Sequence, residues 1–260
     1  MQRQNTAEAI VAHLVANGID RLYCLPGVQN DPFFDALFHE RESLRPIHTR
    51  HEQGAAYMAL GAALATGRPQ AMCVVPGPGF LNAASPLATA YSTNARIFAL
   101  VGQIAAPLLG RMTGALHEIV DQTGILDTMV KESRFIRDAS EVPDAMAALF
   151  RALLGGRPRP VGMEVPMDVW TRTAMLGAAT RVLAPEPPPL DEDAIEAAAK
   201  LLGNAERPLI LAGGGANDVP EALRALAEAL DAPVVTYRMG HGALDWRHPM
   251  AVNLAVGHRC

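Results

Sequence analysis

Apolar positions along the first 170 residues alternate between short continuous runs, typical of buried strands, and longer stretches with a helical period. The runs predict six strands, in RLYCL, RPIHT, QAMCVVP, ARIFALVGQ, SRFIRDA and PVGMEVP. Helical stretches separate them, and one of these extends from Glu52 to Thr66 and is closed by Gly67. This alternation predicts an α/β fold with a doubly wound, six-stranded, mostly parallel sheet and helices on both faces.

Residues 171–190 interrupt this pattern. Four prolines in the segment favour an extended linker, because proline fits neither a helix interior nor a central strand. We therefore predict a first domain over 1–170 and a second, smaller α/β unit over 191–260. The second unit has two helical stretches and two strand-like runs, but its last segment, HPMAVNLAVGHRC, suggests no closing helix and no partner strand. We expect an incomplete domain there.

Composition narrows the classes of function. The chain has 260 residues, a net charge of −5 and no basic run, which argues against nucleic acid as a partner. No apolar run reaches the roughly 18 residues of a membrane span, and the N-terminus lacks the apolar core of a signal peptide. The three cysteines have no metal-ligand spacing and fit a reducing compartment. These features predict a cytoplasmic protein that binds neither nucleic acid nor membrane.

Candidate chemistry gathers where predicted strands end. Glu52 follows the strand RPIHT at the start of an Ala-rich helix, where a carboxylate either stabilises the positive helix end or faces a ligand. Gly77-Pro78-Gly79 follows QAMCVVP and precedes a helix that contains Asn82. Ligands bind at the carboxyl ends of parallel strands, and glycine lets the backbone approach them closely. Each feature by itself is more typical of a structural turn or a helix cap than of a ligand site.

Two other patterns carry less weight. The segment AGGGAND, residues 212–218, is a candidate phosphate cradle at a helix N-terminus. It matches neither GxGxxG nor the Walker A sequence, so a tight turn is favoured. The eight histidines show no HExxH or other ligand spacing, and we predict no metal site.

Several segments, taken in order, carry a family resemblance: LYCLPGVQNDPFFDAL, RHEQGAAYMALGAALATGRPQAMCVVPGPGFLNAASPLATAY, IFALVGQI, HEIVDQTGILDTMVK and RPVGMEVPMDVW. Together they resemble the N-terminal pyrimidine-binding domain of thiamine-diphosphate enzymes, in the group of acetolactate synthase, benzoylformate decarboxylase and glyoxylate carboligase. The resemblance covers about residues 5–170. Residues from about 190 to 260 look like the first half of the family's central domain. That domain binds FAD in some members and is only structural in others, so FAD stays open.

The resemblance implies roles for individual residues. The Glu of the family's RHE-like motif, here Glu52, hydrogen-bonds the aminopyrimidine nitrogen opposite the amino group. This contact favours the imino tautomer, whose nitrogen can remove the proton from the thiazolium carbon. Seven further positions are implied, six at the cofactor edge and one, Gln122, on the substrate side: Pro26, Gly27, Gly77, Pro78, Gly79, Asn82 and Gln122.

Members of this family bind the diphosphate and its Mg²⁺ through a C-terminal domain with a GDG…N segment, which the 260 residues lack. The resemblance also implies an active site shared between chains, in a homodimer or homotetramer. We therefore expect the chain to supply half of a site, as a fragment of a longer protein or one subunit of a split enzyme. By itself it should be inactive.

The favoured interpretation is the N-terminal portion of a thiamine-diphosphate-dependent 2-keto acid decarboxylase or carboligase. RHEQGAAYMA and VGQI favour the acetolactate-synthase-like branch. Three alternatives stay open: a lyase of the benzoylformate or oxalyl-CoA decarboxylase type, a non-catalytic binding or regulatory module with the same fold, and an unrelated nucleotide-binding protein that uses AGGGA.

Overall fold

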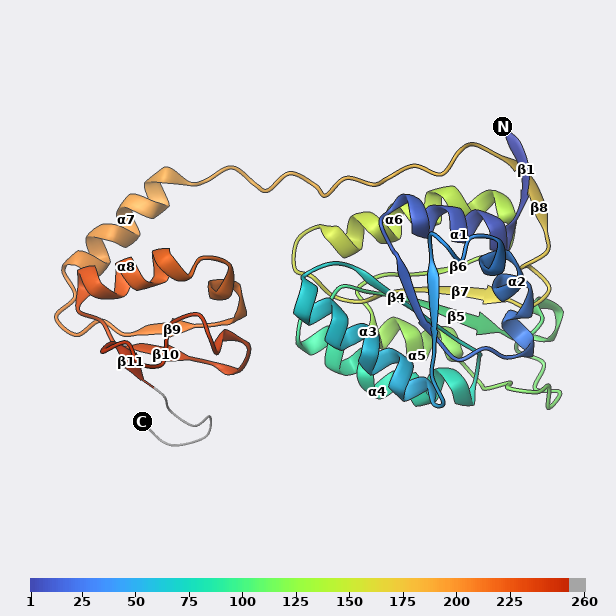
Figure 1. The fold of residues 1–260 in the computed structure, drawn as a ribbon, viewed down its shortest axis with the longest axis horizontal. Coiled ribbons are helices and arrows are strands. Elements are labelled where there is room, and N and C mark those ends of the chain that lie inside the picture. Colours follow the sequence, from blue (N-terminus) through green and yellow to red (C-terminus); the bar gives the residue numbers. More distant parts are fainter. Residues whose placement is uncertain (253–260) are drawn as a thin grey trace. The chain divides into compact units, whose positions relative to one another are not determined.

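The computed structural model describes residues 1–252. The chain forms two compact units that divide between Pro187 and Pro188 (Figure 1). In unit 1 six strands form one sheet in the order β3-β2-β4-β5-β7-β6, and every neighbouring pair is parallel. The strands are β2 (Arg21–Cys24), β3 (Arg45–His48), β4 (Gln70–Val74), β5 (Ile97–Gln103), β6 (Ser133–Phe135) and β7 (Val161–Pro166). The predicted doubly wound sheet is confirmed, and each of its strands lies in one of the six apolar runs.

Helices cover both faces of this sheet (Figure 1). One face carries α1 (Thr6–Ala16), α2 (Asp31–His39) and α6 (Val142–Leu154), and the other carries α3 (Glu52–Thr66), α4 (Pro78–Ser92) and α5 (Gln122–Met129). Strand β4 shows why the runs are continuous. Ala71 and Cys73 pack into the first core, whereas Met72 and Val74 pack into the second. A strand buried on both faces needs apolar residues at every position.

The ends of α3 follow from local chemistry. Gly67 closes the helix with φ 66°, in the left-handed region that glycine adopts at little cost. His51 is the N-cap, and its Nδ1 accepts a hydrogen bond from the Gln53 N–H at 3.1 Å. The first turn is thus capped by His51, which leaves the Glu52 carboxylate available for other contacts.

Unit 1 also contains a small antiparallel pair that periodicity did not suggest. β1 (Gln2–Asn5) lies beside β8 (Thr173–Leu176), with Gln2 opposite Leu176. β8 falls inside the segment expected to be a linker, so residues 173–176 are a strand of unit 1. The polar sequence QRQN carries no apolar alternation, and pairing between ends of the unit 170 residues apart is not visible in local patterns.

Unit 2 contains α7 (Glu192–Gly203), β9 (Ile210–Ala212), α8 (Pro220–Leu230), β10 (Val234–Thr236) and β11 (Ala251–Val252). The three strands are parallel in the order β11-β10-β9. The expectation that HPMAVNLAVGHRC has no partner strand is wrong for residues 251–252, which pair with β10. Residues 253–260 of that segment lie outside the described residues.

Short 3-10 turns complete both units: η1 (Val28–Asn30), η2 (Ala106–Leu108), η3 (Ala139–Glu141), η4 (Gly214–Asp218) and η5 (Arg238–Gly240). Among the helices of residues 1–252, none combines the length and the apolar character needed to cross a membrane.

Candidate functional site

The strand order of unit 1 places a switch point between β2 and β4. From β2 the chain crosses outward to β3, and it then returns past β2 to β4 and continues to β5 on the other side. Loops that leave neighbouring strands in opposite directions open a crevice at the carboxyl edge of the sheet, where ligands bind. Pro26 and Gly27 follow β2 at this point, and the turn 77–79 follows β4.

The two turns touch. A Cβ atom at Gly27 would lie 2.6 Å from Cγ1 of Val75, so only a residue without a side chain fits there. Pro26, one residue earlier, is exposed at the same edge. The structure therefore brings together the segments after β2 and β4, which the sequence had indicated separately.

Glu52 reaches the same edge from the exit of β3. It is the first residue of α3 and is partly exposed, and its Oε2 accepts a hydrogen bond from Nδ2 of Asn82 at 3.0 Å. A Cβ at Gly79 would lie 3.3 Å from Glu52 Oε1 and 2.5 Å from Cγ2 of Val75. Glycine at position 79 thus leaves room for the carboxylate. Within residues 1–252, Oε1 has no hydrogen-bond partner and remains available to a ligand.

The turn after β4 is held from the opposite side by the loop that precedes α5. Gly77 has φ 56°, and a Cβ there would lie 2.3 Å from the carbonyl oxygen of His117. Its N–H donates to Oε1 of Gln122 at 2.7 Å. Pro78, the first residue of α4, is exposed. The glycine is required both by its backbone angle and by the close approach of this loop.

Gln122 is 2% exposed, and hydrogen bonds engage both ends of its side-chain amide. Besides the bond to Gly77, its Nε2 donates to the Gly102 carbonyl at 2.9 Å and to Glu164 Oε1 at 2.6 Å. The side chain is therefore committed to neighbouring protein groups. Its role on the substrate side stays a prediction.

Glu164 on β7 was not singled out from the sequence. It is 1% exposed, and its carboxylate accepts hydrogen bonds from Gln103 Nε2 at 2.7 Å, Gln122 Nε2 at 2.6 Å and Thr123 Oγ1 at 2.7 Å. No Lys, Arg or His nitrogen among the described residues lies within 4.0 Å of it. Burial raises the pKa of Glu164, and the three hydrogen bonds oppose that rise. A single acid inside the apolar run PVGMEVP was the signal that could have revealed it.

Asn30 is a second buried polar residue near this edge. Its Nδ2 donates to the Val74 carbonyl at 2.9 Å, while its Oδ1 is buried without a hydrogen-bond partner. A Cβ at Gly102 would lie 2.1 Å from that oxygen. Asn30 therefore ties the loop after β2 to the end of β4 beneath the crevice.

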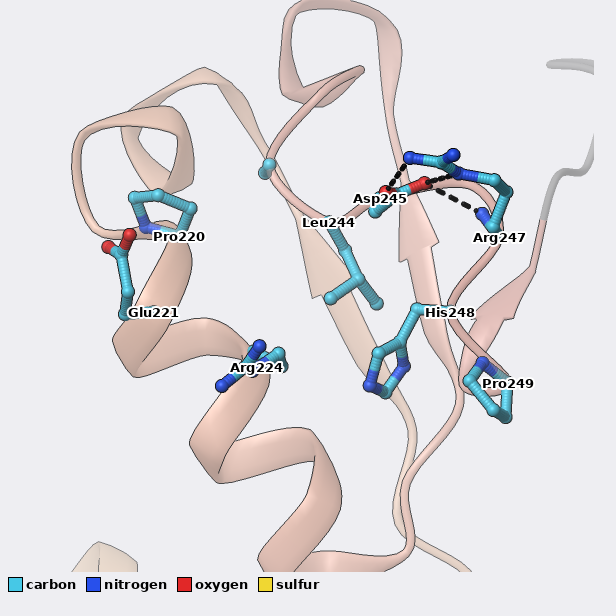
Figure 2. A pocket seen from close by; sticks show the side chains of 9 residues that line it. Pro220, Glu221, Arg224, Leu244, Asp245, Arg247, His248 and Pro249 are labelled. Atoms are coloured by element: carbon cyan, nitrogen blue, oxygen red, sulfur yellow. Dashed lines mark hydrogen bonds and ion pairs between the residues drawn. The ribbon is translucent and has the colours of Figure 1, made fainter.

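Unit 2 has a surface pocket of about 400 Å³ beside α8 (Figure 2). Its lining mixes charges, with Arg224 from the helix and His248, Asp245 and Arg247 from the loop before β11. Asp245 is bonded by Arg247 at 2.7 Å, and these hydrogen bonds lower the pKa of its carboxyl to about 2. None of the predicted site residues lies in this pocket. In the described part of the chain no three His, Cys, Asp or Glu side chains are grouped so as to hold a metal ion.

Two family models match the chain. The model described as "Thiamine pyrophosphate enzyme, N-terminal TPP binding domain" matches residues 4–125, and the model of the central domain of the same enzymes matches residues 195–259. The chain belongs to the thiamine pyrophosphate enzyme family. The first model covers every predicted site residue, from Pro26 to Gln122.

The chain is also similar in sequence to three curated proteins. The chain is 36% identical to "Probable acetolactate synthase large subunit" of Methanocaldococcus jannaschii, over 97% of the chain and 43% of the relative. It is 33% identical to "Acetolactate synthase isozyme 1 large subunit" of Escherichia coli, over 99% and 45%. It is 34% identical to "Probable 2-ketoarginine decarboxylase AruI" of Pseudomonas aeruginosa, over 96% and 44%. The chain thus spans less than half the length of these relatives.

A solved structure agrees in fold. An X-ray structure described as that of a thiamin diphosphate-dependent enzyme from Mycobacterium smegmatis superposes with a TM-score of 0.84 at 23% identity, covering 96% of this chain and 48% of the other.

Proposed function

We propose that this chain forms the N-terminal part of a thiamine-diphosphate-dependent enzyme that acts on a small 2-keto acid. The observation that carries the proposal is the Glu52 carboxylate at the switch point of the sheet. One oxygen is held by Asn82, and the other has no partner among the described residues. Family membership and this geometry together favour the cofactor role of Glu52 over a role as helix cap, which His51 fills.

The residues of this edge fit an aminopyrimidine ring. Gly27, Gly77 and Gly79 let the two turns pack closely against Val75 and His117 beside Glu52, and Glu52 Oε1 is available to share a proton with a ring nitrogen. The Asn82 hydrogen bond orients the carboxylate for that exchange, as expected of a general acid or base. Bound thiamine diphosphate supplies the carbon nucleophile and the electron sink that decarboxylation of a 2-keto acid requires.

The reaction class is supported by the names of the relatives. Acetolactate synthases favour an enzyme that joins the decarboxylated unit to a second carbonyl compound, whereas the 2-ketoarginine decarboxylase represents the simpler lyase. We propose the carboligating branch. We further propose that the diphosphate and Mg²⁺ are held by residues outside this chain, and that FAD, if it is used, binds to unit 2.

Association of two copies is part of the proposal. Helices α3 and α4 carry four large apolar residues, each with an exposed fraction of 41% to 45%: Tyr57, Met58, Leu64 and Leu81. Exposed apolar residues gathered on adjacent helices are typical of contact surfaces. Sedimentation should show a dimer or tetramer, which Met58→Asp shifts toward the monomer.

The decisive experiment compares two Glu→Gln variants at the same helix position. Glu52 begins α3, and Glu192 begins α7 in unit 2, which contains none of the predicted site residues. Thiamine diphosphate with Mg²⁺ is titrated into the ¹⁵N-labelled chain, and amide signals of residues 27, 77 and 79 should move. Glu52→Gln should weaken binding about tenfold or more, as loss of a charge-assisted hydrogen bond does, whereas Glu192→Gln should bind normally.

Catalysis is tested in the enzyme that contains this chain. There Glu52→Gln should lower 2-keto acid turnover about 100-fold or more, the range of lost general acid–base catalysis. Binding and turnover by Glu52→Gln equal to those of Glu192→Gln would refute the role of Glu52. FAD is added in a separate arm, where signals from unit 2 should respond if it binds.

A further inference from the structure

We infer that Glu164 is a positioning residue for the cofactor edge: through Gln122 it holds the N–H of Gly77 and so sets the turn 77–79. This inference rests on the proposed function, because the turn 77–79 is part of the proposed cofactor-binding edge. Glu164 itself is 1% exposed on β7, and among the described residues Gln122 is the only predicted site residue to which it is hydrogen-bonded. Its effect on the site must therefore pass through that side chain.

The orientation of the Gln122 amide carries the argument. Its Nε2 has two hydrogens, and these go to Glu164 Oε1 at 2.6 Å and to the Gly102 carbonyl at 2.9 Å. Both partners accept and neither donates, so the NH₂ end must face them. The amide oxygen is then left facing the Gly77 N–H at 2.7 Å. A flipped amide would place an oxygen against a carboxylate and an NH₂ group against the Gly77 N–H.

A carboxylate suits this task better than a neutral side chain. Burying a charge without a cation is costly, and three hydrogen-bond donors offset that cost here: Gln103, Gln122 and Thr123. A glutamine at 164 would bring its own NH₂ group among those donors. Its amide oxygen could still accept from Gln103 and Gln122 while its NH₂ group turns to the Thr123 hydroxyl, but the negative charge that strengthens the Gln122 bond and fixes the direction of its amide would be gone.

The turn 77–79 is connected to the Glu52 carboxylate through helix α4. Gly77 precedes α4, and Asn82, in the first turns of that helix, donates to Glu52 Oε2. Gly77 is confined by the His117 carbonyl on one side and the Gln122 oxygen on the other. Glu164 therefore lies at the buried end of a chain of contacts that passes through Gln122, Gly77 and Asn82 to Glu52.

Native-state amide exchange of the 260-residue chain tests the inference. In Glu164→Gln the Gly77 amide should exchange several-fold faster relative to the Ala95 amide, because a neutral hydrogen bond replaces the charge-assisted one that orients Gln122. Ala95 is a fitting internal reference, since it is 2% exposed and its N–H is bonded to the Ala90 carbonyl at 2.9 Å. General destabilisation would accelerate both amides together and would leave the ratio unchanged.

The matched control is Gln103→Met. Gln103 also donates to Glu164 Oε1 and is 5% exposed, but in the described part of the chain its side chain makes no hydrogen bond to Gly77 or Gln122. This variant should leave the Gly77 to Ala95 ratio within about twofold, since the Gln122 bond persists. Gln122→Met should reproduce the effect of Glu164→Gln, and it replaces that variant if Glu164→Gln does not fold. An unchanged ratio in Gln122→Met and Glu164→Gln, or an equal change in Gln103→Met, would overturn the inference.

Titration with thiamine diphosphate and Mg²⁺ separates this inference from the proposed function. If the wild-type chain binds, Glu164→Gln should bind several-fold more weakly while Gln103→Met binds normally. Equal binding by all three would overturn the positioning role. If the wild-type chain shows no binding, turnover by Glu52→Gln in the enzyme that contains this chain decides the proposed function, and the exchange ratio at Gly77 still decides whether Glu164 positions the turn.

Discussion

The two units of this protein share the same alternation of strand and helix, but their strands and helices are buried to different extents. In unit 1 the central strands β4 and β5 are buried at every residue. In unit 2 α7 has no buried residue, and Leu209 and Leu211, at and beside β9, are 66% and 69% exposed. An apolar run therefore predicts a strand in both units, but its burial depends on a helical layer on each face of the sheet, which within residues 1–252 only unit 1 has.

The cores differ accordingly. Unit 1 fully buries large side chains such as Trp170, Phe33, Phe98 and Phe150. The core of unit 2 consists of alanines, leucines and one valine: Ala212, Leu223, Ala227, Val234, Ala243 and Leu244. Because stabilisation scales with the apolar area removed from water, we expect unit 1 to be the more stable of the two. The following tests are arranged from the largest expected effect to the smallest.

The largest contrast should come from truncating one apolar residue in each unit. Phe98 is 0% exposed and stacks on Phe150 with ring centroids 5.5 Å apart, so Phe98→Ala should lower the free energy of unfolding by about 3–5 kcal/mol. Leu211→Ala should cost about 0.5 kcal/mol or less. Urea unfolding followed by circular dichroism and by the fluorescence of Trp170 in unit 1 and Trp246 in unit 2 measures both. Equal losses would show that the outer face of β9 is buried in solution.

Two glycines with positive φ sharpen the comparison at the level of the backbone. Gly77 has φ 56° and only 2.3 Å between a Cβ and the His117 oxygen, whereas Gly242 has φ 98° and open space around it. Gly77→Ala should therefore cost about 2–4 kcal/mol, from backbone strain and steric conflict together. Gly242→Ala should cost about 1 kcal/mol, from the backbone alone. Similar losses in thermal unfolding would contradict the tight packing of the turn.

The pKa values of one carboxylate in each unit are shifted in opposite directions. The pKa of buried Glu164 is raised above its ordinary value of 4.5, so the folded protein binds more protons than the unfolded chain just above pH 4.5. The stability of the wild type relative to Glu164→Gln should therefore fall as pH rises through that interval. Urea unfolding between pH 4.5 and 7 measures the difference, and a difference that rises with pH would contradict it.

Asp245 is the counterpart in unit 2. Arg247 lowers the pKa of its carboxyl from 3.8 to about 2, so its stabilising contribution is present above pH 3.8 and is lost as pH falls toward 2. Carboxyl ¹³C NMR should record this pKa, and Arg247→Gln should return it toward 3.8. An unchanged titration in Arg247→Gln would assign the shift to another cause.

The smallest effect concerns the two buried thiols of unit 1. Cys24 and Cys73 lie opposite each other on β2 and β4, and burial raises the pKa of Cys24 to about 11 and that of Cys73 well above its usual range. In a Cys260→Ser background a thiol reagent at pH 8 should leave the native protein unmodified, because the thiolate is absent and inaccessible. Both thiols should react in urea. Rapid labelling without urea would mean that unit 1 opens readily.

Local patterns were enough to predict the six strands of unit 1 and the extent of α3. The central strands β4 and β5 are largely apolar and buried at every residue, and α3 ends at a glycine that adopts a left-handed conformation. Local patterns missed β1 and β8, because QRQN is polar and its partner is 170 residues away. The site was accessible only in part: Glu52, Asn82 and the turn 77–79 were indicated by sequence motifs and by the family resemblance.

The sequence by itself determined where helices and strands form in unit 1, because the period of apolar residues and the capping residues act over a few positions. Only the tertiary structure decided that the ends of β2, β3 and β4 meet at one edge, where Asn82 donates a hydrogen bond to Glu52. It also decided that Gln122 is hydrogen-bonded to both Glu164 and Gly77. These contacts join segments 30 to 45 residues apart, and their geometry depends on strand order and burial, which no local pattern encodes.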